Sequence, residues 1–252
     1  MNFNAGIITF GPLIWEHTHL IVKWRLMSLM GYYETNSPLQ LASEGIQVQK
    51  AISLPIRYGC LSSKHGDTCG IILSNHSTTL PGQAYIAPIR YTIKNAKILE
   101  NHAFALSAVG LSYEREFSLN RSWGTVGLLI NPNIDTKDKR SADVIRNRWA
   151  KIYESYQTFD YTQYRIEKDE VPVIDENGFI QIPWTDEMNE FDFILVPAFM
   201  PNPQRILSAR EIAEQMAAKD YRLYFDKNRE HNVQTFQDEN ILDILNGTET
   251  KM

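Results

Sequence analysis

The stretch from Gly6 to Trp15 joins an apolar strand to a glycine turn, and its residue types point to a binding site. It reads Gly-Ile-Ile-Thr-Phe-Gly-Pro-Leu-Ile-Trp. An apolar run that ends in Gly11-Pro12 predicts a buried strand followed by an abrupt reversal of the chain. Because glycine has no Cβ, a small ligand can approach the main chain closely there. The same pattern also fits an ordinary edge strand and turn, so both interpretations stay open.

Two further residues with binding chemistry, Arg57 and Tyr58, lie on a later predicted strand. The planar guanidinium of an arginine beside a glycine turn can hold a substrate carboxylate through paired hydrogen bonds. The alternative for Arg57 is a surface ion pair with one of the 30 acidic residues. Trp15 either walls a pocket or packs in the core as an ordinary aromatic side chain.

A helix expected over residues 92–109 carries an acid close to the core. Apolar residues recur there every three or four positions, which predicts one buried stripe, and Gly110 supplies a stop. Glu100 lies at the margin of this stripe, one turn after Ala96. Its carboxylate is therefore expected either at the solvent rim or over a cavity.

The other expected elements make an alternation of strands and helices. Pro55 lies within the strand expected at 51–60 and predicts that this strand is an edge strand or contains a bulge. Strands are expected at 51–60, 68–73, 83–91, 124–130 and 191–199, a hairpin at 171–182, and helices from residue 37, at 141–156 and at 208–217. Ser141 is the expected N-cap of the second of these helices, and Ser208 with Glu211 forms a capping box at the start of the third.

The composition is typical of a soluble globular protein. The chain has 252 residues, of which 43% are hydrophobic and 22% charged, and its formal net charge is −5. This acidic balance argues against a nucleic-acid partner, since nucleic-acid-binding domains are usually basic. We find no apolar run long enough for a transmembrane helix and no basic-then-apolar secretory leader. We therefore expect no membrane association and a cytoplasmic location.

The cysteines and histidines give no metal site. In a reducing compartment Cys60 and Cys69 are expected as free thiols, and neither has a CxxC partner. His17 and His19 have the wrong spacing for one face of a helix. The sequence also lacks the nucleophile elbow GxSxG, the phosphate loop GxxxxGK[ST], the dinucleotide motif GxGxxG and the zinc motif HExxH.

The order of strand, glycine turn, strands and acid-bearing helix resembles the gamma-glutamyl cyclotransferase-like family over about residues 6–130. In that family a loop of the type Tyr-Gly-Ser-Asn/Leu holds the gamma-glutamyl group through backbone amides. A glutamate on a later helix serves there as acid and base. Here the segment Phe10-Gly11-Pro12-Leu13 stands at the place of the loop, and Glu100 stands near the place of the acid.

The resemblance implies a fold, a division of the chain and a reaction. The fold would be α+β, a small mixed β-barrel or sheet with flanking helices over residues 1–134. Residues 135–252 would form a C-terminal α/β extension packed on it. The α-amine of a gamma-glutamyl compound would attack its own γ-carbonyl, release an amine and close 5-oxoproline. Glu100 would transfer the protons, and Phe10, Gly11, Pro12, Leu13, Arg57 and Tyr58 would bind this small-molecule substrate without a cofactor.

Pro12 departs from the family pattern, because proline has no backbone N–H to donate. Loss of one oxyanion donor costs about 2.7–4 kcal/mol of transition-state stabilisation in other enzymes. A catalytically inactive ligand-binding or protein-interaction module on the same fold is therefore the alternative. The sequence gives no indication of oligomeric state.

Overall fold

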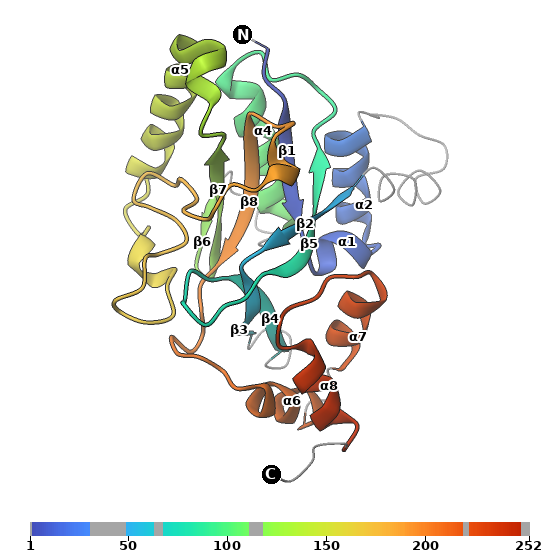
Figure 1. The fold of residues 1–252 in the computed structure, drawn as a ribbon. Coiled ribbons are helices and arrows are strands. Elements are labelled where there is room, and N and C mark those ends of the chain that lie inside the picture. The colour runs from blue at the N-terminus through green and yellow to red at the C-terminus, as the bar shows by residue number, and fades with distance from the viewer. Residues whose placement is uncertain (1, 31–48, 63–67, 111–117, 219–221, 248–252) are drawn as a thin grey trace.

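The computed structural model describes residues 2–30, 49–62, 68–110, 118–218 and 222–247. Figure 1 shows the chain running from a central sheet to a group of C-terminal helices below it. The helix expected from residue 37 lies outside the described residues.

The main sheet of the described residues has six strands in the order β2-β5-β1-β8-β7-β6. Strand β1 pairs antiparallel with β5 and parallel with β8, so the sheet is mixed. Strands β3 and β4 form a separate antiparallel ribbon. The bounds are Ala5–Thr9 (β1), Lys50–Leu54 (β2), Ile56–Ser62 (β3), Thr68–Leu73 (β4), Gly82–Pro88 (β5), Asn120–Arg121 (β6), Gly124–Ile130 (β7) and Phe193–Phe199 (β8).

Helices cover the sheet and the ribbon in two groups. Helix α4 contacts α1, α2, α5, β7 and β8, whereas α6 packs on α8 and on β4. Figure 1 shows α6, α7 and α8 gathered beside the β3–β4 ribbon. The bounds are Pro12–Trp15 (α1), His19–Arg25 (α2), Leu26–Met30 (η1), Ala96–Gly110 (α4), Ile134–Glu154 (α5), Tyr161–Gln163 (η3), Asp186–Met188 (η4), Ala209–Ala218 (α6), Arg222–Glu230 (α7) and Asp238–Leu245 (α8).

Strand β1 is the central strand that leads to the glycine turn. All five of its residues are buried, because β5 and β8 flank it on both edges and side chains cover both faces. Gly6 allows this packing: a Cβ there would lie 3.0 Å from side-chain atoms of Ile86 and of Phe191. The buried strand therefore fixes the position and direction of the main chain where it enters the turn.

The expected mixed α+β architecture is confirmed, whereas the barrel alternative is not, since no sheet of the described residues closes on itself. Pro55 marks the point at which the chain leaves the main sheet. It separates β2 from β3, because proline cannot donate to a strand ladder, and β3 then pairs with β4 outside the main sheet.

The C-terminal half contributes a central strand. Strand β8 belongs to the segment predicted as an extension, yet it lies between β1 and β7. The division of the chain at residue 134 stays a prediction.

Within the described residues, no helix is both long enough and apolar enough to cross a membrane.

The N-cap predicted for α6 is confirmed, whereas the cap predicted at Ser141 in α5 is formed by another residue. Ser208 caps α6 as expected: the Glu211 N–H donates to its Oγ at 3.2 Å, and its own N–H donates to the Glu211 carboxylate at 2.9 Å. Helix α5 begins earlier than predicted, at Ile134, and is kinked at Asp138. Asp138 accepts from the Ser141 N–H at 3.0 Å, so Asp138 takes the capping role that was expected of Ser141.

Candidate functional site

Gly11 turns the chain at the end of β1, as the sequence predicts. Its backbone angles are φ 61° and ψ −143°, a conformation that side-chain-bearing residues rarely adopt. Pro12 follows as the first residue of α1, where a missing N–H breaks no helical hydrogen bond. The Ile14 N–H donates to the Gly11 carbonyl at 2.9 Å. We call residues 10–15 the Gly11 turn.

The side chains of Phe10 and Leu13 face the core and not solvent. Both are buried, and the Phe10 ring meets Phe199 edge to face with centroids 6.0 Å apart. These two residues can therefore serve a ligand through their main chain only.

Arg25 holds the main chain of the turn in place through hydrogen bonds to its carbonyl groups. Its Nε and Nη2 donate to the Leu13 carbonyl at 3.0 and 2.7 Å, and Nη2 reaches the Pro12 carbonyl at 3.5 Å. The side chain is fully buried, and burial lowers the pKa of Arg25 to about 10, opposed by the nearby Glu16. These bonds make the turn a preorganised backbone surface.

Helix α7 covers the turn with two side chains one helical turn apart. A Cβ on Gly11 would lie 2.9 Å from the Tyr224 hydroxyl, and this hydroxyl accepts from the Ile71 N–H at 3.3 Å. Asn228 Oδ1 accepts from the Trp15 indole N–H at 2.9 Å. Trp15 also meets the Tyr224 ring edge to face at 6.0 Å. Residues i and i+4 of one helix thus contact both ends of the turn.

Tyr58 lies on the same side, among the residues that α7 and α8 bring to the ribbon. Its side chain is fully buried, and burial raises its pKa well above the usual range. Asp238 and Tyr224 raise it further, while Asn228 opposes the rise. The Tyr58 N–H donates to Gln237 Oε1 at 2.9 Å. The structure therefore brings Tyr58 to the neighbourhood of Gly11, with Tyr224 between them.

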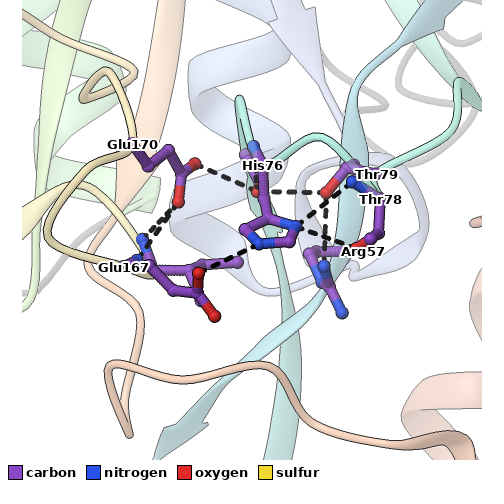
Figure 2. A network of polar contacts seen from close by, with 8 residues as sticks. Arg57, His76, Thr78, Thr79, Glu167 and Glu170 are labelled. Carbon is purple, nitrogen blue, oxygen red and sulfur yellow. Dashed lines mark hydrogen bonds and ion pairs between the residues drawn. The ribbon is translucent and has the colours of Figure 1, made fainter.

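Arg57 has different neighbours, because successive side chains of a strand face opposite ways. Its Nη1 donates to Thr79 Oγ1 at 3.3 Å, and its guanidinium lies over the Phe236 ring at 5.6 Å. The Thr79 hydroxyl donates to Ser74 Oγ at 3.1 Å, and the Ser74 hydroxyl donates to Glu170 Oε1 at 3.3 Å. Figure 2 shows this network, in which a buried cation reaches a carboxylate through two hydroxyls. Burial lowers the pKa of Arg57, and Glu170 opposes that change.

The same network contains a hydroxyl, an imidazole and a carboxylate in series (Figure 2). His76 Nδ1 lies 2.8 Å from Thr78 Oγ1, and Nε2 lies 3.4 Å from Glu167 Oε2. This order matches a nucleophile, its base and an orienting acid. However, Thr78 and Glu167 are exposed, and the Thr78 N–H also donates to Nδ1 at 3.2 Å. We therefore read it as a turn closed by side-chain hydrogen bonds.

Glu100 is held by an ion pair that joins α4 to α5. Its buried carboxylate accepts from Nε of Arg148 and, at 3.1 Å, from Nη2 of the same residue. Lys97 Nζ lies 3.6 Å away. The pair joins α4 to α5, as expected of a charge that is buried only with its partner.

A backbone pairing near residue 93 ties the segment before α4 to the start of β1. Ile93 and Phe3 exchange backbone hydrogen bonds of 2.8 and 3.2 Å just before β1 begins, and α4 starts three residues after Ile93. Glu100 lies about 6 Å further along that helix, and its acid–base role stays a prediction.

A surface hollow of about 440 Å³ lies next to the loop that precedes α8. Gln234 in this loop bridges to Gln83 of β5 through hydrogen bonds of 2.7 and 3.0 Å. Thr235 both lines the hollow and donates through its hydroxyl to Asp238 Oδ1 at 2.6 Å. The lining residues are Ala51, Ile52, Ser53, Pro81, Gly82, Gln83, Glu187, Gln234, Thr235 and Phe236.

Sequence reasoning missed the residues that cover the turn. Tyr224 and Asn228 come from the C-terminal half, where no motif marks them. Arg25 was also missed. The spacing of Tyr224 and Asn228 was a usable signal, because it places both on one face of a helix.

Comparisons with known proteins add no assignment: no family model, no curated protein and no solved structure matches this chain.

Proposed function

We propose that the protein is a gamma-glutamyl cyclotransferase-like enzyme that binds its substrate at the Gly11 turn. The observation that carries the proposal is the turn itself. A buried central strand ends in a glycine with φ 61°, and Arg25 holds the carbonyls that follow. A preorganised main chain of this kind suits a substrate that must be held in one conformation to cyclise.

The reaction is an intramolecular acyl transfer. The α-amine nitrogen attacks the γ-carbonyl carbon and forms the C–N bond of the lactam, and the C–N bond to the leaving amine breaks. One proton leaves the attacking nitrogen and one reaches the leaving nitrogen, so no oxidant, reductant or metal is consumed. The products are 5-oxoproline and a free amine.

The experiment is an assay of 5-oxoproline release from a panel of gamma-glutamyl amides by the full chain. The proposal predicts release that needs folded protein and that falls when Gly11 carries a side chain, as in G11A. E100Q tests the acid separately: unchanged turnover removes Glu100 from the mechanism but leaves the turn. No release from any member of the panel would overturn the proposal.

A ligand-binding module without catalysis is the second candidate, and one observation favours it. Both oxygens of Glu100 are engaged by Arg148, so this carboxylate must leave an ion pair before it can accept a proton from substrate. This candidate predicts that gamma-glutamyl compounds bind the protein and are recovered unchanged.

A further inference from the structure

Strand β2 forms one edge of the main sheet, and no strand of the described residues pairs with its outer side. The opposite edge is different, because the outward groups of β7 are engaged there. The Val126 N–H donates to the Leu119 carbonyl at 3.1 Å, and the Leu128 N–H donates to the Gly178 carbonyl at 3.0 Å. An open edge presents N–H and C=O groups that can pair with another extended chain.

The strand register shows which groups of β2 point outward. In an antiparallel pair, residues that exchange hydrogen bonds with the partner strand alternate with residues whose main-chain groups point away from it. Gln83 of β5 points away from β2, because its N–H and carbonyl bond to Gln234 at 2.7 and 3.0 Å. Gln83 lies opposite Ser53, and two residues along, Tyr85 lies opposite Ala51. Ala51 and Ser53 therefore direct their N–H and C=O groups to the open side of β2.

The surface hollow of about 440 Å³ lies along these groups. Ala51 and Ser53 both line it, and both are exposed. The loop before α8 supplies further lining residues, Gln234, Thr235 and Phe236. The volume falls within the range of ligand sites. A side chain of an added strand therefore has space beside the main-chain groups that would hold the strand.

Glu187 gives the hollow a negative charge. It is the one ionisable residue among those that line the hollow, and its carboxylate is ionised at neutral pH. Helix η4, which carries it, packs against β2. Lys50 does not neutralise this carboxylate through an ion pair: its Nζ donates to the main-chain carbonyl of Glu187 at 3.1 Å and pairs with Glu190 Oε1 at 3.3 Å. The hollow is therefore complementary to a cationic side chain.

From these features we propose that the open edge of β2 binds an extended peptide segment of a partner protein and takes a lysine or arginine side chain of that segment into the hollow beside Glu187. The main-chain groups of Ala51 and Ser53 would pair with the added strand whatever its sequence, and Glu187 would select a basic residue. This division between main-chain affinity and side-chain selection is general for strand addition to a sheet edge. The surface does not include the Gly11 turn, so the inference is independent of the proposed function.

The test is a titration of the ¹⁵N-labelled full chain with the blocked peptide acetyl-Thr-Lys-Val-Lys-Thr-amide, followed by NMR. We expect saturable shifts of the Ala51 and Ser53 amide resonances. The counterpart with glutamate in place of both lysines should bind at least tenfold more weakly, because its charges would meet Glu187. E187Q should remove this preference. E214Q, which removes an exposed acid from α6, is the matched control and should keep it.

Two substitutions at one position test the strand pairing itself. S53P removes an N–H that points away from β5, and proline is tolerated at such edge positions. It should fold and should weaken peptide binding at least tenfold. S53A keeps the N–H and removes only the hydroxyl, so it should bind as the wild type does.

Peptides that are N-methylated keep the test informative if S53P does not fold. One carries the methyl group on the valine nitrogen and the other on both lysine nitrogens. Because alternate N–H groups of a strand face the same neighbour, one of the two peptides should lose at least tenfold in affinity.

Four results would overturn the proposal. They are no saturable shift of the Ala51 and Ser53 amides with the lysine peptide, equal binding of the lysine and glutamate peptides, affinities of folded S53P and of both methylated peptides within twofold of the unmodified pair, and shifts of the same amides with protein concentration alone. The last result would show that a second copy of this chain occupies the edge.

Discussion

Replacing Gly11 with alanine tests whether Tyr224 and the turn form one packed unit. Two costs follow from the structure. A residue with a side chain at φ 61° and ψ −143° carries strain of about 1–3 kcal/mol. In addition, the new Cβ would lie 2.9 Å from the Tyr224 hydroxyl, which must shift. G11A should therefore lower the free energy of unfolding by about 2–4 kcal/mol.

The second variant, Y224F, separates the two costs. It removes the hydroxyl, and the next ring atom lies 3.6 Å from the same Cβ, an ordinary contact. Y224F alone should cost about 1–3 kcal/mol, because it leaves the buried Ile71 N–H without its acceptor. The double variant should be more stable than the sum of the single effects predicts, by about 1 kcal/mol.

Urea unfolding of the four proteins, followed by tryptophan fluorescence, gives the cycle. The reasoning fails if G11A stays within about 0.5 kcal/mol of wild type, the usual range of a neutral surface substitution. It also fails if the two substitutions are additive, since Tyr224 would then not press on the turn.

Three other predictions concern groups outside the turn. Burial raises the pKa of Asp238, so the native state binds a proton more tightly than the unfolded state. Stability should then fall as pH rises from the ordinary aspartate pKa to the raised native one, and D238N should lose that part of the pH dependence in thermal unfolding. W149F should cost about 1–3 kcal/mol in urea, because the indole N–H donates to the buried Gly178 carbonyl at 3.0 Å. R148M should lower the melting temperature more than E100Q, since only R148M leaves a buried carboxylate with the more distant Lys97 at 3.6 Å.

Much of the fold follows from local patterns. The apolar runs of β1, β4 and β7 and the capping box at Ser208 each specify an element without help from distant residues. Pro55 likewise marks the break between β2 and β3. These signals act over a few residues, so a sequence displays them directly.

The pairing of distant strands could not be read in this way. Whether β8 lies beside β1 depends on how two faces bury their apolar residues after some 180 residues of intervening chain. Local propensity carries no information about such a pairing, and the predicted division at residue 134 accordingly did not anticipate a shared sheet.

The candidate site shows the same contrast between residues with a local signal and residues placed by long-range packing. Gly11 was found because a positive φ demands glycine, which is a local requirement. Arg57 and Tyr58 were predicted together as substrate-binding residues, but the alternation of a strand sends their side chains to opposite sides, and their binding role stays a prediction. Glu100 was read as a helix-margin acid. Its partner Arg148 lies 48 residues away, and only the packing of α4 on α5 joins them.

The most direct measurement of the central claim is a crystal structure of the full chain with L-glutamate. The account predicts glutamate bound against the main chain of residues 10–15. Glutamate bound elsewhere, or no glutamate at the Gly11 turn at a saturating concentration, would contradict it.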